Sequence, residues 1–177
     1  MLGFAAVKRM FRARSVEMTI TILLLFSALS VGLMAGVYFT FSVFVMRSLD
    51  ALEMPAGMIA MQSINRIIQR SLFLPLFFVS SLTCLALVVL GVMRWGEPGA
   101  WQMATGGALY VIGMLVVTVA GNVPLNNALD AVDANSAEAE AMWRRYMQRW
   151  LPWNHVRSIS CAISMGLLIS AIVMHKV

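Results

Sequence analysis

Two asparagines flank a proline in a stretch that is otherwise apolar. Asn122 and Asn126 lie four residues apart with Pro124 between them, so on a helix both amides point to one side. The proline also deprives the carbonyl of Ala120 of its helical donor, which leaves an acceptor that something must satisfy. This pattern is typical of a kinked helix end that binds a ligand or a neighbouring segment. The alternative is a kink whose amides only tie helices together.

A second polar cluster lies at the entrance to the last apolar stretch, where Trp150, Asn154, His155 and Arg157 occur together. Arg157 is permanently charged, and His155 is the ionisable group near it that titrates around neutral pH. If His155 faces the inside of the protein, it is the best available proton acceptor. Interfacial anchoring is the competing interpretation, because tryptophans and arginines at membrane boundaries commonly contact lipid headgroups.

Asn65, which is followed by Arg66 and Arg70, could supply a third polar contribution, although a water-exposed face is the alternative. Other chemistry has little support. The cysteines Cys84 and Cys161 fall within apolar runs and the two histidines are far apart, so no cluster has metal-ligand spacing. The sequence also has no glycine-rich nucleotide motif and no serine-hydrolase motif. We therefore expect no metal and no cofactor.

The composition indicates a membrane protein. Of the 177 residues, 60% are hydrophobic and 12% are charged, whereas soluble domains have about 25% charged residues. The 13 Lys and Arg residues outnumber the 8 Asp and Glu residues, but they form short clusters and not a face suited to nucleic acid. We expect membrane lipids, with anionic headgroups among them, as the neighbours of these cations.

Four long uncharged stretches predict transmembrane helices over approximately 18–46, 71–93, 100–129 and 155–175. Each is near or above the roughly 20 residues that span a bilayer. The first is longer than a cleaved signal core of roughly 7–15 residues, so we expect it to remain in the protein. The predicted fold is all-α: a single transmembrane domain, 1–177, built as a four-helix bundle with both termini on one side.

The two longer connections predict amphipathic helices over approximately 56–70 and 136–150. Apolar residues recur at helical spacing on one face of each: Met61, Ile64 and Ile68, then Trp143, Met147 and Trp150. We expect both helices to lie as a cap over one mouth of the bundle.

Small residues at four-residue spacing predict packing surfaces, because close contact between helices in lipid depends on small side chains. They form two ladders: Ala28, Gly32, Gly36 and Thr40, then Ala162, Gly166 and Ser170. The alternative is that glycine is simply common in membrane helices.

The basic residues on the two sides of the bundle are nearly balanced, so the flank of the first span decides the predicted orientation. Lys8, Arg9, Arg12 and Arg14 precede that span, and basic residues favour the cytoplasmic side. We therefore expect cytoplasmic termini and a cap on the opposite side.

The sequence resembles the anthrone-oxygenase family, a broad group of small four-span proteins that are mostly bacterial. The resemblance rests on the first span at 32–42, the Met61-Gln-Ser-Ile-Asn65 segment, the Asn122-Val-Pro-Leu-Asn126 element, and Trp150 with Asn154 and Arg157. It covers nearly the whole chain beyond residue 18, and it implies a bacterial inner-membrane protein.

The resemblance implies oxidation of an anthrone, a tricyclic phenolic ketone, to an anthraquinone with O2 and without a metal or flavin. Loss of the acidic carbon-bound proton gives an enolate that reacts with O2, which requires a base, oxyanion donors and a dry pocket. The implied roles are a base (His155), oxyanion donors (Arg157, Asn122, Asn126 and Asn154), a stacking ring (Trp150) and a further substrate contact (Asn65). The alternatives are a non-catalytic binder of flat lipophiles such as quinones and a structural or accessory subunit. The sequence is also compatible with a homo-oligomer.

Overall fold

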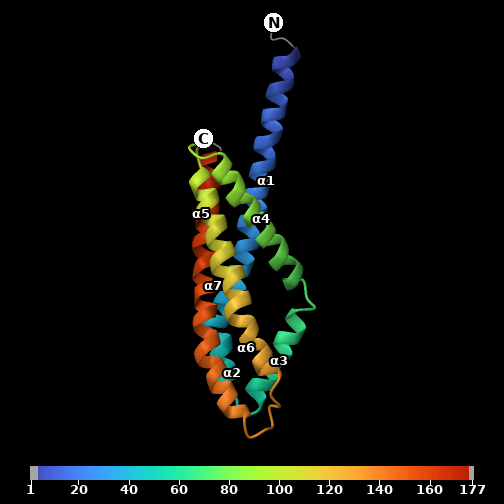
Figure 1. Ribbon diagram of the computed structural model, residues 1–177, viewed down its shortest axis with the longest axis vertical. Coiled ribbons are helices and arrows are strands. Elements are labelled where there is room, and N and C mark those ends of the chain that lie inside the picture. The colour runs from blue at the N-terminus through green and yellow to red at the C-terminus, as the bar shows by residue number, and fades with distance from the viewer. Residues whose placement is uncertain (1–3, 176–177) are drawn as a thin grey trace.

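The computed structural model describes residues 4–175, and every regular element in that range is helical (Figure 1). In chain order the elements are α1 (Phe4–Thr40), η1 (Phe41–Val45), α2 (Met46–Asp50), α3 (Ala56–Ile68), α4 (Phe73–Met93), α5 (Ala100–Tyr110), η2 (Val111–Val116), η3 (Thr118–Asn122), α6 (Val123–Asp130) and α7 (Ala139–His175). The η segments are π-helical turns, whose backbone hydrogen bonds join residues five apart.

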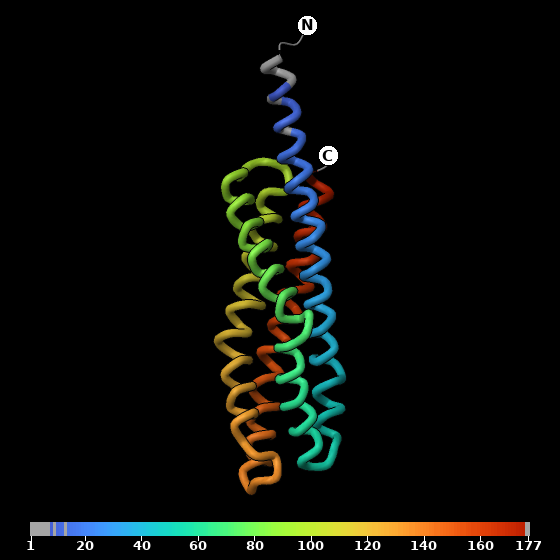
Figure 2. The backbone as a smooth tube through the Cα atoms, turned by 90° about the vertical axis from the view of Figure 1, so that its right-hand side faces the viewer, coloured from blue at the N-terminus to red at the C-terminus, as the bar shows by residue number. Residues whose placement is uncertain are grey.

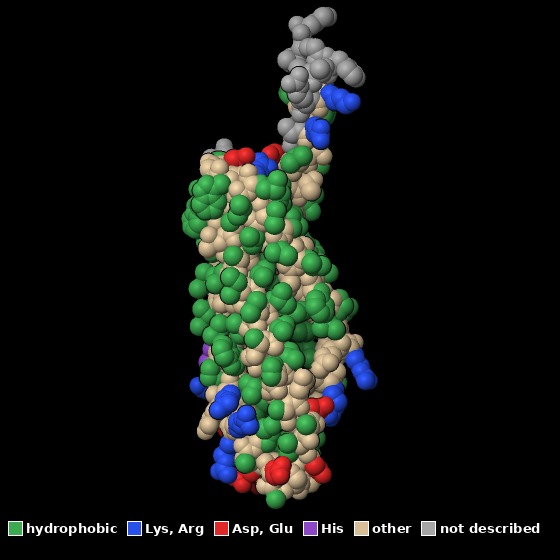
Figure 3. Space-filling view, in the orientation of Figure 1, with side chains coloured by type: hydrophobic (Ala, Val, Ile, Leu, Met, Phe, Trp, Pro, Cys, Tyr) green, Lys and Arg blue, Asp and Glu red, His purple; other side chains and the backbone are tan. Residues whose placement is uncertain are grey.

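These elements join into four long rods. Helix is continuous through Met10–Asp50, Phe73–Met93, Ala100–Asp130 and Ala139–His175, and each rod is long and apolar enough to cross a membrane. Figure 3 shows apolar side chains over the middle of the molecule and charged side chains gathered towards its two ends. The chain is a multi-pass integral membrane protein, and the prediction of an all-α bundle is confirmed.

The rods pack side by side along their length (Figures 1 and 2): α1 against α7, α4 against α5, and α5 against α7. The start of α1 and the end of α7 lie towards the same end of the molecule. There, Arg94 donates hydrogen bonds of 2.6 Å to Glu17 and to Glu97. The hydrogen bond with Glu17 raises the pKa of the Arg94 guanidinium above its ordinary value. These ion pairs connect the ends of three rods, because His175 also contacts Glu17.

Two glycines hold α4 and α5 in backbone contact. A Cβ atom on Gly107 would lie 2.5 Å from the carbonyl oxygen of Cys84, and one on Gly91 would lie 2.6 Å from the carbonyl oxygen of Ala100. Since no side chain fits at these positions, the two helices approach as closely as small residues in membrane helices allow.

The predicted small-residue ladders pack only in part. Gly32 lies directly against Met165 of α7, but a Cβ atom on Gly36 or on Gly166 would meet no atom within 4 Å. The expectation that both ladders form packing surfaces is therefore wrong at these two glycines. The reason is geometric: a four-residue repeat identifies one face of a helix, but not whether that face meets a helix or lipid.

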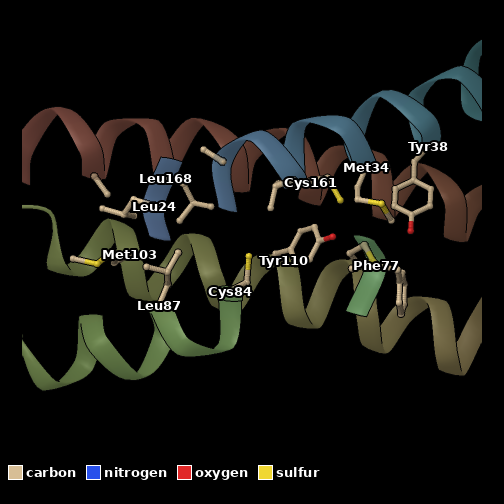
Figure 4. Close-up of a cluster of buried hydrophobic side chains, with 14 of the residues drawn as sticks. Leu24, Met34, Tyr38, Phe77, Cys84, Leu87, Met103, Tyr110, Cys161 and Leu168 are labelled. Carbon is tan, nitrogen blue, oxygen red and sulfur yellow. The ribbon is translucent and has the colours of Figure 1, made fainter. Parts of the chain in front are cut away.

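The half of the bundle nearest the chain ends has a filled core. In Figure 4, Leu24, Leu87, Met103 and Leu168 gather in one layer, with Cys84, Tyr110 and Cys161 beside them. The buried hydroxyl of Tyr110 is satisfied by Ser80 at 2.6 Å. This half of the bundle is therefore held together by apolar packing, and the cavity of the candidate site lies in the other half.

The two predicted cap segments do not lie across the mouth of the bundle. Segment 136–150 is not a separate helix, because most of it forms the first turns of α7, which runs on through Pro152. Trp143 stacks on Tyr146, and Tyr146 stacks on Trp150, with ring centroids 6.0 and 5.8 Å apart. This aromatic row is buried against neighbouring helices, so the amphipathic stripe continues the bundle lengthwise.

The other cap segment forms α3, which also runs lengthwise beside α6 (Figures 1 and 2). Gln62 is buried and donates hydrogen bonds of 2.9 Å to the backbone carbonyls of Leu129 and Val132. Arg66 pairs with Asp130 at 2.6 Å on the outer side. These contacts hold α3 parallel to the long axis of the bundle. In this position the apolar face of α3 closes one side of the bundle.

Candidate functional site

A cavity of about 330 Å³ lies in the half of the bundle formed by α3, η3, α6 and the start of α7. All four rods contribute to it. Its polar lining consists of Tyr38, Asn65, Gln69, Thr118, Asn126, Asn127, Asn154 and Arg157. The volume is at the lower end of the roughly 300–1,000 Å³ typical of small-molecule pockets, which suits a ligand of two or three fused rings.

Arg157 supplies the only formal charge among the described residues that line this cavity. The side chain is 5% exposed. Its Nη2 donates to Oδ1 of Asn154 at 2.7 Å, and its Nη1 donates a longer hydrogen bond to Thr118 at 3.4 Å. The guanidinium carbon lies 4.3 Å from the ring centroid of Tyr38 and 5.2 Å from that of Trp150, so two aromatic faces stabilise the cation.

No carboxylate in the described range, 4–175, forms a salt bridge with Arg157. The Nε of Arg157 and the hydroxyl of Tyr38 are buried and have no hydrogen-bond partner in that range either. A buried charge is costly unless it is paired and hydrogen-bonded. The free donors and the uncompensated positive charge together favour a ligand that carries a negatively charged oxygen.

Asn154 fixes the position of that guanidinium. It is fully buried, and its Nδ2 donates hydrogen bonds of 2.8 Å to the backbone carbonyl of Tyr38 and to Oγ of Ser42. Its Oδ1 is therefore directed at Arg157. The two residues are three apart on α7 and so share a face of the helix. Asn154 thus connects the first rod to the guanidinium of Arg157 on the fourth rod.

A second polar region lies around Asn126. Its Oδ1 accepts hydrogen bonds from the hydroxyl of Tyr146 at 2.9 Å and from Nε1 of Trp150 at 2.8 Å. These bonds orient the indole of Trp150, which lines the cavity. Asn65 of α3 also lines the cavity and is 6% exposed, and its Nδ2 has no partner among the described residues. That amide is available to a ligand oxygen.

The structure does not bring Asn122 or His155 into the cavity. Asn122 is fully buried, but its Nδ2 donates to the backbone carbonyl of Trp150 at 3.2 Å, so it ties η3 to α7. His155 is exposed on the outer face of α7. No His, Asp, Glu, Lys or Cys side chain of the described residues lines the cavity, which therefore contains no side chain that titrates near neutral pH.

Aromatic rings form the apolar walls of the cavity. Phe73 and Phe77 lie with centroids 6.2 Å apart and their planes tilted by 31°. Phe73 also meets the ring of Tyr38 edge-on at 6.3 Å, and Phe41 lies 5.9 Å from Trp150. Rings arranged in this way favour a flat, aromatic guest.

Four polar lining residues were not predicted from the sequence: Tyr38, Gln69, Thr118 and Asn127. Tyr38 and Thr118 are the two among them that lie within the transmembrane rods next to Arg157. π-helical turns lie beside both: η1 begins three residues after Tyr38, and η3 begins at Thr118. Such turns occur most often at functional sites, because the extra residue changes the direction of side chains. A signal was available in the sequence, since a hydroxyl within an apolar span is costly unless it has a partner.

Comparison with known families supports the resemblance seen in the sequence. A family model described as anthrone oxygenase matches residues 61–167. The chain belongs to the anthrone oxygenase family. Comparisons with curated proteins and with solved structures found no match.

The region matched by the family model contains most of the cavity. Asn65, Asn126, Trp150, Asn154 and Arg157 all fall within residues 61–167. The first rod, with Tyr38 and Phe41, lies before the matched region, so its contribution to the cavity is known from the structure alone.

Proposed function

We propose that this protein binds the oxyanion of a flat, lipophilic phenol or enolisable ketone, and that it promotes the reaction of the bound enolate with O2. The observation that carries the proposal is the guanidinium of Arg157, which is buried in an aromatic cavity and has no carboxylate partner within residues 4–175. Its position favours the ionised form of a ligand over the neutral form. Membership of the anthrone oxygenase family supports an anthrone as the first substrate to test.

The reaction balances without a further co-reactant. An anthrone loses its carbon-bound proton and becomes an enolate, whose negative oxygen lies at Arg157 in this proposal. The electron-rich carbon then bonds to O2, and the resulting peroxide takes up a proton. Loss of water, with departure of the remaining hydrogen on that carbon, forms the second carbonyl. Anthrone and O2 are thus converted to anthraquinone and water.

The absence of a neutral-range base among the described lining residues makes electrostatic stabilisation the main contribution of the protein. The first proton passes to water, because Arg157 lowers the free energy of the enolate that remains. Fixed donors of this kind are typically worth 10²–10³ in rate, or about 2.7–4 kcal/mol. No metal or flavin is needed in this scheme.

A non-catalytic role is the second candidate, and it is supported by the same cavity. A flat acidic quinone that does not react with O2 would make the same contacts to Arg157 and to the aromatic walls. In that case the protein binds the ligand and holds it in the membrane, as a carrier or an accessory subunit.

The test uses purified protein in lipid nanodiscs with an oxygen electrode and a simple anthrone. We expect O2 uptake above the no-protein rate, reduced by about 10²-fold or more in Arg157→Gln. His155→Ala is the matched control, because this side chain lies two residues away on the outer face of α7; we expect it to retain full activity. Uptake equal to the no-protein rate, combined with Arg157-dependent binding of an acidic quinone, would favour the non-catalytic role.

We also propose that the termini face the cytoplasm and that the protein resides in a bacterial inner membrane. Lys8, Arg12 and Arg14 flank the first span at the end where Glu17 pairs with Arg94, and such clusters favour the cytoplasmic side. The cavity then lies near the outer boundary of the membrane. Labelling of a single cysteine placed at Ser136 from outside the cell tests this orientation; labelling only after lysis would reverse it.

A further inference from the structure

We infer that the ligand of this cavity is an amphiphile, whose acidic ring binds at Arg157 and whose apolar chain passes sideways between α4 and the η3–α6 segment into the lipid. This inference rests on the proposed function, because the ring is placed by the same cation. It adds the class of ligand: a ring system with a long alkyl or isoprenoid substituent.

The first observation is the difference in exposure across the cavity. Arg157 and Asn154, on the inner wall, are 5% and 0% exposed. Phe78, Val119 and Val123 line the same cavity but are 54%, 59% and 39% exposed. The cavity therefore has a closed, polar inner wall and an open side that is apolar at Phe78, Val119 and Val123. An elongated guest with one polar end matches this gradient.

The second observation is how the helices separate at the rim. Towards the end where the chain termini lie, α4 packs on α5 through glycines, whereas α3 packs on α6 at the other end. Between these two contacts α4 leans away from its neighbour (Figure 1). The exposed apolar lining residues of the cavity come from both elements: Phe78 from α4, and Val119 and Val123 from the η3–α6 segment.

The third observation is the depth of the opening. Phe78 lies roughly 24 Å along α4 from Arg94, at about 1.5 Å of rise per residue. The hydrocarbon core of a bilayer is about 30 Å thick. With Arg94 at one boundary, Phe78 is still inside the core, so the opening faces acyl chains. The exposed amides of Gln69 and Asn127 complete the rim.

The volume of the cavity is compatible with this inference. About 330 Å³ is at the lower end of the range for small-molecule pockets. In this proposal the substituent leaves through the open side, where it meets other apolar groups. A closed pocket of the same size would reject such a ligand, because forcing extra methylene groups into a packed interior is strongly unfavourable.

The experiment compares two hydroxynaphthoquinones, one without a side chain and one with a decyl chain beside the acidic hydroxyl, by titration into protein in nanodiscs. Affinities are expressed relative to the concentration of ligand in the membrane. We expect the affinity for the decyl compound to lie within about threefold of the affinity for the unsubstituted compound. We expect Val119→Trp to weaken binding of the decyl compound by about tenfold or more relative to its effect on binding of the unsubstituted ring.

Val116→Trp is the matched control, because Val116 is 51% exposed on the same rod and does not line the cavity; we expect no effect on either ligand. If the unmodified protein binds the unsubstituted ring but does not bind the decyl compound, this inference is overturned and the proposed function is left intact. Equal effects of Val119→Trp on both ligands would overturn it as well. If neither ligand binds, the proposed function and the inference both fail.

Discussion

The substitution Asn154→Asp tests the electrostatic role of the cavity with almost no change in shape. The Oδ1 atom of Asn154 accepts from Nη2 of Arg157 at 2.7 Å, so a carboxylate in the same place would pair directly with the guanidinium. The introduced carboxylate would then neutralise the guanidinium of Arg157. A ligand oxyanion would therefore no longer be attracted by an unpaired positive charge.

The magnitude follows from the separation of the charges. Two unit charges about 4 Å apart interact by about 4 kcal/mol at an effective dielectric constant near 20. A ligand oxyanion at that distance would lose most of this attraction. We expect a loss of about 2–4 kcal/mol in binding, or roughly 30-fold to 1,000-fold in Kd. An uncharged ring of the same shape should lose much less.

The assay is titration of an acidic hydroxynaphthoquinone and of its neutral methyl ether into nanodisc-bound protein. Asn154 also donates to the backbone carbonyl of Tyr38, and the carboxylate cannot, so thermal unfolding must show that the variant stays folded. His155→Asp is the charge-matched control one residue away on the exposed face. Unchanged affinity for the acidic ligand in a folded Asn154→Asp variant would refute the reasoning.

Three further predictions concern packing and the strength of individual contacts. Gly107→Ala should destabilise the protein by about 1–3 kcal/mol in thermal unfolding, because its Cβ would lie 2.5 Å from the Cys84 carbonyl, whereas Gly36→Ala meets nothing within 4 Å and should be neutral; equal effects would contradict the α4–α5 packing. Arg94→Gln should cost no more than about 1 kcal/mol, since its two carboxylate partners are 45% and 52% exposed; a larger loss would show that these pairs are more than surface contacts. Thr118→Val should change the affinity for an acidic ligand by less than about tenfold, because it removes a long 3.4 Å hydrogen bond to the guanidinium and a local one to the carbonyl of Met114 on the same rod; a greater loss would mean that Thr118 contacts the ligand.

Hydropathy and helical spacing were sufficient to predict the class of fold. Charge-free stretches longer than a bilayer is thick leave few alternatives to transmembrane helices. The amphipathic segments were also identified as helical. Their direction was not predictable, because an apolar stripe is buried equally well against a membrane surface or against another helix. In the structure, Trp143, Tyr146 and Trp150 pack on neighbouring helices, and the contacts that decide this come from distant parts of the chain.

The candidate site was found in part. Asn65, Asn126, Trp150, Asn154 and Arg157 were selected because polar groups at a membrane boundary require partners, and all five line one cavity; their roles stay predictions. His155 was also selected, but it does not line the cavity. It is two residues from Arg157, and residues two apart on a helix do not share a face. With Arg157 directed inwards, His155 had to be directed outwards.

The π-helical turns could not be predicted from the sequence. In a π-turn a backbone N–H donates to the carbonyl five residues earlier and not to the one four residues earlier. Packing across the bundle determines which of the two hydrogen bonds forms, and the local residue pattern does not. The turns η1 and η3 lie next to the cavity in the first and third rods. Tyr38 and Thr118 could still have been recognised as parts of the site from their hydroxyl groups within apolar spans.

The most direct test of the central claim is the absorption spectrum of a bound acidic quinone as a function of pH. The anion of a hydroxynaphthoquinone absorbs at longer wavelength than the neutral form, so its ionisation in the site can be measured. Stabilisation of the anion by Arg157 predicts that the bound ligand stays ionised to lower pH than the same ligand in empty nanodiscs, and that Arg157→Gln removes this difference. A ligand that binds in its neutral form, with the same spectrum in both proteins, would contradict the account.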